Sequence, residues 1–223
     1  MKETQQDFKD KLLVVKDEST IRDDDLIFLK MIKKHIKNIE VFDITNKSSD
    51  EIIKTLFMYS LPTLILGKVK NKSLIPIKAF LRKQPQLDIE NKYNSGLTMV
   101  AEAIIRKIEP YLDENKSIII YNDTTRIGLP LKSFLSNHDV IILRNNKNAN
   151  KTPYNKANIL VLANYGKKFH VSEENLKNMD IVIDLSNSID YEGKITSVDT
   201  VKILKERLEL FNSRKILATT WNI

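Results

Sequence analysis

One succession of strand, turn, helix and strand over residues 95–187 constrains the fold of this chain more than any other feature. The apolar segment Ser117–Tyr121 predicts a buried strand, and the helix expected after it carries Leu131, Phe134 and Leu135. The turn NDTTRIGLP lies between them. In dinucleotide-binding folds the phosphates bind at such a junction, because backbone N–H groups and a helix N-terminus converge there. The segment therefore predicts a Rossmann-like, nucleotide-binding domain.

Strands and helices alternate along the rest of the chain as well. The predicted strands lie at residues 12–15, 39–44, 62–66 and 215–218, and the predicted helices at residues 23–37, 48–59, 97–111 and 198–210. Residues 68–94 contain Pro76 and Pro85 but no clear hydrophobic period, and we expect this stretch to be irregular. Alternation of this kind is typical of α/β layers built on parallel sheets.

We expect two α/β domains with a cleft between them. The expected divisions are an N-terminal domain at residues 1–97, a linker helix at 98–113, a Rossmann-like cofactor-binding domain at 114–205 and a C-terminal return segment at 206–223. The boundary is placed near residues 95–113 because the stretch before it is weakly patterned.

Composition excludes several classes of protein and site. The absence of cysteine rules out disulfides and thiolate chemistry, and the three histidines lack metal-ligand spacing, so no metal site is expected. No apolar run approaches the ~20 residues of a membrane span, and the N-terminal apolar stretch is too short for a signal peptide. We therefore expect a cytoplasmic protein with no membrane partner. The net charge of +7 comes from scattered lysines, and the densest run, residues 30–38, lacks aromatic side chains that stack on bases, so no nucleic-acid partner is expected.

Four segments of the second half carry a family resemblance. They are YNSGLTMVAEAIIRKIEPYL, NDTTRIGLP, ANILVLANYGK and IVIDLSNS. Together they resemble the methylenetetrahydrofolate dehydrogenase/cyclohydrolase family of the bifunctional FolD type, whose segments read Pro-Cys-Thr-Pro-x-Gly, Gly-Arg-Ser-x-x-Val-Gly-x-Pro, Ala-Asp-Leu-Leu-Ile-Val-Ala-x-Gly-Lys and Ile-Val-Ile-Asp-Val-Gly-Ile-Asn. Gly96, Gly128, Gly166 and Gly193 fall where that family keeps a glycine. Glycine is retained where the backbone needs positive φ or close approach, so the resemblance implies an inherited fold.

By this resemblance, the catalytic residues of the N-terminal, folate-type domain are Lys30 and Asp88. The family carries a Tyr-x-x-x-Lys pair on its first helix, and here Lys30 stands at the lysine and Leu26 at the tyrosine. The resemblance implies that this lysine drives proton transfer in the cyclohydrolase step. The segment PQLDIEN resembles Pro-x-x-Asp-Val-Asp-Gly, which makes Asp88 the counterpart of an aspartate that contacts folate. The alternatives are a solvated lysine on a polar helix face and a loop aspartate in solvent.

The same resemblance implies that the turn and a later loop bind the cofactor. The implied cofactor-binding residues are Asn122, Asp123, Thr124, Gly128, Pro130 and Ser186. Asn122 stands at the family's first glycine, and Asp123 stands at an arginine that suits the 2′-phosphate of NADP. The implied cofactor is NADP or NAD, and an aspartate at this place favours the free ribose hydroxyl of NAD.

Departures from the family pattern fall on the residues of the expected chemistry. Leu26 replaces the tyrosine, LILGKVKNKS replaces a segment whose glutamine lies beside the lysine, and residues 185–188 replace a glycine-containing loop near the nicotinamide. The family ends with a glycine-rich loop and a last helix that packs on the first domain, and we expect this chain to stop where that loop begins. The sequence therefore predicts a divergent, C-terminally truncated relative of folate one-carbon metabolism with its dehydrogenase activity weakened or lost.

The alternative is a non-catalytic relative that keeps the fold for binding or for pairing with another subunit. In either case the resemblance implies a folate-type small molecule as ligand. It also implies a homodimer formed through the cofactor domain.

Overall fold

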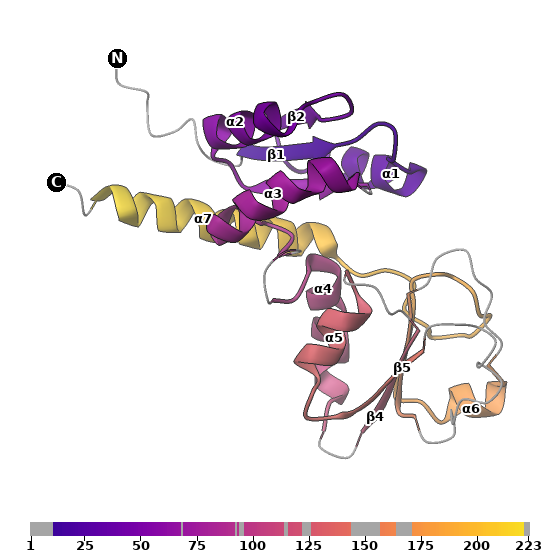
Figure 1. The fold of residues 1–223 in the computed structure, drawn as a ribbon. Helices are drawn as coiled ribbons and strands as arrows, with labels where there is room; N and C mark the ends of the chain where they lie inside the picture. The colour runs from indigo at the N-terminus through magenta and orange to yellow at the C-terminus, as the bar shows by residue number, and fades with distance from the viewer. Residues whose placement is uncertain are drawn as a thin grey trace. The chain divides into compact units, whose positions relative to one another are not determined.

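The computed structural model describes residues 11–67, 69–91, 93, 96–113, 116–121, 126–143, 157–163 and 171–220. The chain divides into two compact units, the first made of Met1–Ser95 with Val201–Ile223 and the second of Gly96–Thr200. Each unit contains its own parallel sheet (Figure 1). The expectation of two α/β domains is therefore confirmed, whereas the divisions expected at residues 97, 113 and 205 stay a prediction.

The first unit is built on a three-stranded parallel sheet. Its strands are β1 (Lys11–Lys16), β2 (Asn38–Asp43) and β3 (Thr63–Leu66), in the order β2-β1-β3. The central strand β1 has four consecutive apolar residues, Leu12 to Val15, and all of them are buried. A run of this kind is typical of a parallel strand that is covered on both faces.

Two helices of the first unit follow β1 and β2, as the alternation predicts. They are α1 (Asp23–Lys33) and α2 (Ser49–Tyr59). The Ser48 hydroxyl accepts a hydrogen bond from Glu51 N at 3.3 Å, and the Glu51 carboxylate accepts one from Ser48 N at 2.8 Å. This reciprocal capping box satisfies backbone donors at the start of α2 and fixes where the helix begins.

The prediction that residues 68–94 are irregular is wrong. Asn71–Lys83 form helix α3, which contains Pro76. A proline has no N–H, so the carbonyl of Lys72, four residues earlier, loses its helical donor. That carbonyl accepts a hydrogen bond from the Ser49 hydroxyl of α2 instead, at 3.3 Å. A partner from another helix thus offsets part of the cost that makes proline a helix breaker in sequence analysis.

The strand predicted at residues 215–218 is also wrong, because these residues continue a helix. Helix α7 runs over Thr200–Thr220, and Ile203, Leu204 and Leu208 on it are buried. Residues 215–218 pair with no strand in the described sheets. A lone strand would leave its backbone groups unpaired, whereas a helix satisfies them internally.

The second unit contains a four-stranded parallel sheet. Its elements are α4 (Met99–Ile108), the short 3₁₀ helix η2 (Glu109–Tyr111), β4 (Ser117–Tyr121), α5 (Gly128–Phe134), β5 (Asp139–Leu143), β6 (Ile159–Leu162), α6 (Glu173–Lys177) and β7 (Ile181–Asp184). The strand order is β5-β4-β6-β7. The chain passes from β4 to β5 on one side and then crosses to β6 on the other, so the order reverses between β4 and β6. Ligands of Rossmann-like sheets bind at such a switch point.

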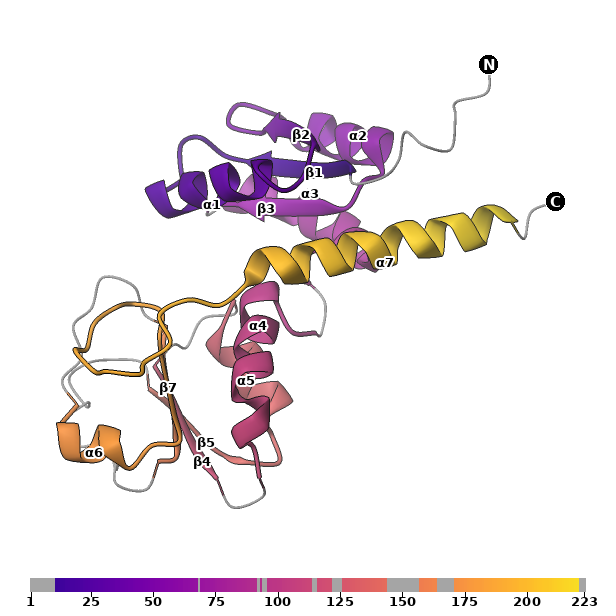
Figure 2. The ribbon, with the colours of Figure 1, turned by 180° about the vertical axis from the view of Figure 1, so that it is seen from behind.

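Helices cover both faces of this second sheet. Ile118 and Ile120 of β4 pack in one cluster with residues of α4 and α5, whereas Ile119 packs in another with Leu176 of α6. Figure 2 shows α4 and α5 on one side of the sheet and α6 on the other. The alternating strand residues thus form two cores, as a parallel sheet between two helical layers requires.

Candidate functional site

The predicted catalytic lysine lies on helix α1. Lys30 and Leu26 are exposed and lie one turn apart on this helix. Their side chains therefore share a face, which is the geometry that the Tyr-x-x-x-Lys spacing requires. The catalytic role of Lys30 stays a prediction.

Asp88 lies in a buried position beside the edge strand of the first sheet. It follows a short 3₁₀ helix, η1 (Pro85–Leu87), and forms an isolated parallel bridge with Thr63 of β3. Only 6% of its surface is exposed. Its Oδ2 accepts a hydrogen bond from Tyr93 N at 2.8 Å. The alternative of a loop aspartate in solvent is thus excluded.

A second carboxylate, which the sequence analysis missed, lies two residues further on. Glu90 is 2% exposed. Burial raises the pKa of the Tyr93 hydroxyl, and the negative charges of Glu90 and Asp88 raise it further. The signal was present in the sequence, because the pattern Pro-x-x-Asp-Val-Asp-Gly contains two acids and PQLDIEN keeps both.

The residue after Glu90 supports this correspondence. Asn91 has a φ of 59°, in the left-handed region. Glycine adopts this conformation without strain, and asparagine tolerates it better than most residues. The family pattern has glycine at this place, and the backbone at Asn91 has a conformation that glycine adopts without strain.

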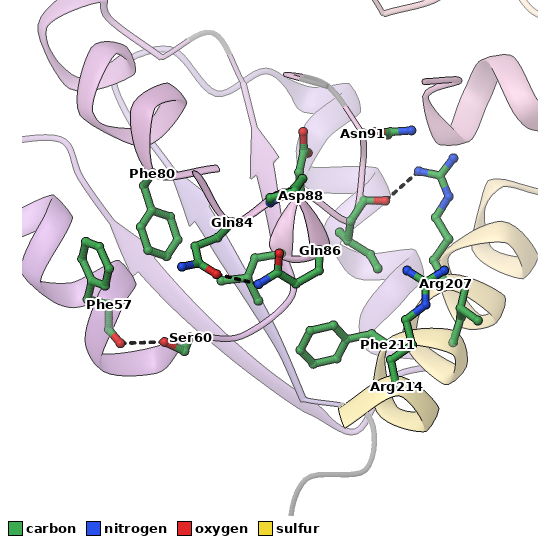
Figure 3. Close-up of a pocket in the computed structure, with 14 residues that line it drawn as sticks. Phe57, Ser60, Phe80, Gln84, Gln86, Asp88, Asn91, Arg207, Phe211 and Arg214 are labelled. Carbon is green, nitrogen blue, oxygen red and sulfur yellow. Dashed lines mark hydrogen bonds between the residues drawn. The ribbon is translucent and has the colours of Figure 1, made fainter. Parts of the chain in front are cut away.

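Asp88 lines a pocket that lies entirely within the first unit (Figure 3). The pocket has a volume of about 570 Å³ and lies between the C-terminal end of α2, the segment from α3 to the loop after η1, and α7. Phe57, Phe80 and Phe211 contribute aromatic rings, and Arg207 contributes a guanidinium. Lys30 is not one of the residues that line it.

In the second unit the structure places only some of the predicted cofactor residues. Asn122, Asp123 and Thr124 lie outside the described residues. Gly128 is the first residue of α5 and is buried, and Pro130 is half-buried in the first turn of the same helix. Both follow β4 at the switch point of the sheet, where a Rossmann-like cofactor would bind.

The turn before α5 is tied to the start of helix α4. The Thr98 hydroxyl donates a hydrogen bond to the Arg126 carbonyl and accepts one from Ala101 N at 3.3 Å. Thr98 thereby caps α4, and the same side chain holds the backbone at Arg126, two residues before α5. This buried threonine was also missed by the sequence analysis, and a threonine before an apolar helical run is the signal for it.

Ser186 follows β7 and does not stand free for a cofactor. Its hydroxyl donates to the carboxylate of Asp184 at 2.7 Å, and this carboxylate is fully buried. Ser188 N, Ile189 N and Lys194 Nζ also approach the carboxylate, at 2.8, 3.0 and 3.4 Å. Burial alone would raise the pKa of Asp184, but hydrogen bonds from Ile189 N and from the serines at positions 186 and 188 hold it below its ordinary value.

The sheet order separates the two groups of predicted cofactor residues. Gly128 and Pro130 follow β4, and Ser186 follows β7, with β6 between the two strands. Neighbouring strands lie ~4.8 Å apart, so two spacings put the strand ends on the order of 10 Å apart. A molecule as long as a dinucleotide could span this distance. The structure thus brings Gly128 and Pro130 together and places Ser186 at the next strand but one.

Two kinds of element are not found among the described residues. No group of three or more His, Asp or Glu side chains is arranged to hold a metal ion in the part of the chain that the structure describes. Within the same residues, no helix has the length and apolar character needed to cross a membrane.

The geometry defines a class of protein with two α/β units on parallel sheets, the second of Rossmann-like type. Similar solved structures are the bifunctional FolD enzymes, methylenetetrahydrofolate dehydrogenase/cyclohydrolases, of Campylobacter jejuni and Thermoplasma acidophilum, and that of Trypanosoma brucei in complex with NADP and an inhibitor. The first is 14% identical, with a TM-score of 0.63 over 93% of this chain and 89% of that chain. The Trypanosoma structure is 14% identical, with a TM-score of 0.61 over 92% of this chain and 87% of that chain. The Thermoplasma structure is 14% identical, with a TM-score of 0.59 over 92% of this chain and 90% of that chain.

This chain therefore has the fold of the bifunctional methylenetetrahydrofolate dehydrogenase/cyclohydrolases, which confirms the fold that the sequence resemblance implies. No family model matches the sequence, and no curated protein matches it. At this low identity the solved structures establish the arrangement of the backbone.

One expectation from the resemblance is corrected by the structure. A chain that stopped where the family's glycine-rich loop begins would lack the last helix, which in the family packs on the first domain. Helix α7 belongs to the first unit, where Arg207 Nη1 donates to the Ile89 carbonyl at 2.7 Å. The predicted helix ends at residue 210, before the strand predicted at residues 215–218, whereas α7 continues to Thr220. The family's glycine-rich loop stays a predicted loss, since residues 194–200 contain no glycine.

Proposed function

We propose that this chain is a divergent relative of the methylenetetrahydrofolate dehydrogenase/cyclohydrolases. It binds a folate-type small molecule through its first unit, and its dehydrogenase activity is weakened or lost. The observation that carries the proposal is the segment at residues 88–91, which has two buried acids and, at Asn91, a left-handed backbone conformation that suits the glycine of the family pattern. A fold shared over about nine tenths of each chain supports it.

The proposed hydrolytic step relies on Lys30. In this proposal water adds to the methenyl carbon and gives a proton to the neutral amine of Lys30, which is exposed on α1. The resulting ammonium returns the proton to the ring nitrogen as the carbon–nitrogen bond breaks and the ring opens. Asp88 would bind the amino groups of the pterin through charge-assisted hydrogen bonds. Both residues belong to the first unit.

The residues of the second unit fit a nicotinamide cofactor poorly, so no hydride transfer is assigned. Gly128 permits a close backbone approach, but Asp123 would repel the 2′-phosphate of NADP and leaves NAD as the better candidate. Ser186 stands where the family pattern has glycine, and its hydroxyl is hydrogen-bonded to Asp184. The Ser186 side chain occupies space at the place where, in the family, the glycine backbone approaches the nicotinamide.

A second candidate function is a non-catalytic binding or subunit-pairing protein. Leu26 favours it, because an exposed aliphatic side chain replaces the tyrosine that stacks on folate in the family. In this version the second unit forms a homodimer, and the protein acts in the cytoplasm as a folate-binding partner.

Absorbance assays separate these functions. We expect the purified chain to hydrolyse methenyltetrahydrofolate, and we expect little oxidation of methylenetetrahydrofolate with NADP or NAD. Lys30→Ala should abolish hydrolysis, whereas Lys33→Ala, at another exposed lysine of α1, should retain it. Fast oxidation would contradict the weakened dehydrogenase.

The remaining outcomes concern binding. A folate-induced rise in melting temperature without turnover would support the second candidate. Absence of both turnover and a melting shift would contradict any folate function.

A further inference from the structure

The pocket of the first unit has an aromatic wall that the proposed function leaves unused. Phe57 of α2 and Phe80 of α3 meet edge to face, with ring centroids 4.8 Å apart and an interplanar angle of 78°. Phe57 is still 54% exposed, and Leu210 of α7 is about as exposed, although both line the pocket. Apolar side chains from two helices thus meet solvent inside one hollow. This is the composition of a ligand site rather than of a closed core.

Two arginines of α7 place positive charge at the same pocket. Arg207 is held by its hydrogen bond to the Ile89 carbonyl. Arg214 lies two turns further along α7, is exposed, and forms no ion pair or hydrogen bond with the residues that the structure describes. Among the described residues that line the pocket, Asp88 is the one acid; it is 6% exposed and accepts a hydrogen bond from Tyr93 N. The accessible charge is therefore positive.

A pair of amides adds polar groups to the wall opposite α7. Gln86 Nε2 donates to Gln84 Oε1 at 2.5 Å, and both side chains line the pocket (Figure 3). This bond leaves the Gln84 amide nitrogen and the Gln86 oxygen as a donor and an acceptor for a ligand. The pocket thus combines an apolar wall, a cationic rim and neutral hydrogen-bonding groups.

We propose that this pocket binds a small amphipathic carboxylate. The apolar body lies against Phe57, Phe80 and Leu210, and the carboxylate pairs with Arg214. A guanidinium matches a carboxylate in bidentate geometry, and phenyl rings supply apolar area with few rotatable bonds. The volume of about 570 Å³ lies within the ~300–1,000 Å³ of small-molecule sites, which favours a small molecule over a protein surface.

The proposed ligand site stands apart from the proposed catalytic lysine. Lys30 does not line the pocket, and the ligand class is argued only from residues that do. Asp88 belongs to both proposals, so the test leaves it unchanged. A measurement of binding then answers a different question from a measurement of turnover.

Isothermal titration calorimetry on the full chain tests the proposal with 3-phenylpropanoate as the probe. The matched control compound, 3-phenylpropanamide, keeps the ring and removes the charge. We expect saturable binding of the carboxylate with a Kd of about 1 mM or tighter, given the ligand efficiency of small compounds. The amide should bind about tenfold more weakly, because a charge-assisted pair is lost.

Two variants locate the binding. Arg214→Gln should weaken the carboxylate about tenfold and leave the amide unchanged, whereas Arg82→Gln removes an exposed arginine of α3 that does not line the pocket and should change neither. Phe57→Ala should weaken both probes. Its control is Phe134→Ala in the second unit, where the side chain is 57% exposed. All four side chains are exposed, so the variants are expected to fold.

The outcomes against the proposal are equally definite. The proposal is overturned if binding of 3-phenylpropanoate does not saturate up to about 10 mM, a concentration well above the Kd expected from ligand efficiency. Equal binding by Arg214→Gln and Arg82→Gln would overturn it as well. Lys30→Ala should bind the probe with the same Kd as the native chain. The binding experiment therefore tests the pocket even if the chain shows no hydrolysis.

Discussion

The Ser186 hydroxyl donates a hydrogen bond to the fully buried carboxylate of Asp184 across 2.7 Å. The same carboxylate accepts backbone N–H groups from Ser188 and Ile189 and lies 3.4 Å from Lys194 Nζ. These bonds fold the loop after β7 back on the end of that strand. The serine at the position of the family's glycine thus stabilises a buried charge, and this explains how the loop can depart from the family pattern and remain ordered.

The first prediction concerns Ser186→Gly. Losing a hydrogen bond to a charged group should lower the free energy of unfolding by about 1.5–3 kcal/mol. If the added side chain blocks the cofactor, the variant should also show a larger rise in melting temperature with NAD than the native chain. Ser188→Ala, which also removes a hydroxyl from Asp184, is the control and should lose stability without a gain in binding. Equal NAD-induced shifts in all three proteins would contradict the cofactor part of this prediction.

The second prediction concerns acid. The folded-state pKa of Asp184 lies below its ordinary value of ~3.9, so its stabilising effect is complete above that pH and declines as pH falls toward the folded value. Asp184→Asn should cost about 3 kcal/mol at pH 6, because Lys194 loses its buried partner. Urea unfolding should show this difference shrink by about 1 kcal/mol per pH unit below ~4.

A surface pair provides the control for the acid experiment. Glu173 and Lys177 lie 4.0 Å apart, and both side chains are exposed. Glu173→Gln should change the free energy of unfolding by less than about 1 kcal/mol at both pH 6 and pH 3. A difference for Asp184→Asn that stays constant between pH 6 and pH 3 would contradict the prediction.

The third prediction tests the turn after the two buried acids. Asn91 has a φ of 59°, so Asn91→Gly should be neutral or stabilise the chain by up to about 1 kcal/mol. Asn91→Ala should destabilise it by about 1 kcal/mol, because a Cβ without a local polar group is strained there. Thermal unfolding measures both. The reverse order of stability would show that the Asn91 side chain matters more than the backbone conformation.

The fourth prediction restores an aromatic residue on α1. Leu26 is exposed one turn before Lys30, so Leu26→Tyr should fold normally and offer a ring to a bound pterin. We expect folate to bind about tenfold more tightly, measured by fluorescence quenching. Ile27→Tyr, at the adjacent exposed residue on another part of the helix surface, is the control. Equal affinity in the two variants would place the ligand away from this face.

Local patterns predicted most of the architecture, and long-range partners account for what they missed. The run Leu12 to Val15 indicates a buried parallel strand because every residue in it is apolar. Helix α3 was missed because Pro76 reads as a breaker, and the hydroxyl of Ser49, which compensates for it, lies 23 residues from Lys72. No single-segment pattern contains that information.

The candidate site divides in the same way. The burial of Asp88 depends on a bridge to Thr63, which lies 25 positions earlier and is not evident from the loop sequence itself. The role of Glu90 could have been predicted from the sequence, because the Asp-x-Asp spacing of the family pattern contains it. The pocket beside Asp88 could not have been predicted, because α7, which forms one of its walls, lies more than 100 residues further along the chain.

The placement of α7 has a consequence for synthesis on the ribosome. Residues 96–200 are translated between the two pieces of the first unit, so the second unit can collapse while the first still lacks its final helix. Until then the apolar ends of α2 and α3 face water without their third wall. The first unit, although its N-terminal part is synthesised first, therefore completes its folding after the second unit. Its exposed apolar surface is the one that a chaperone would bind during synthesis.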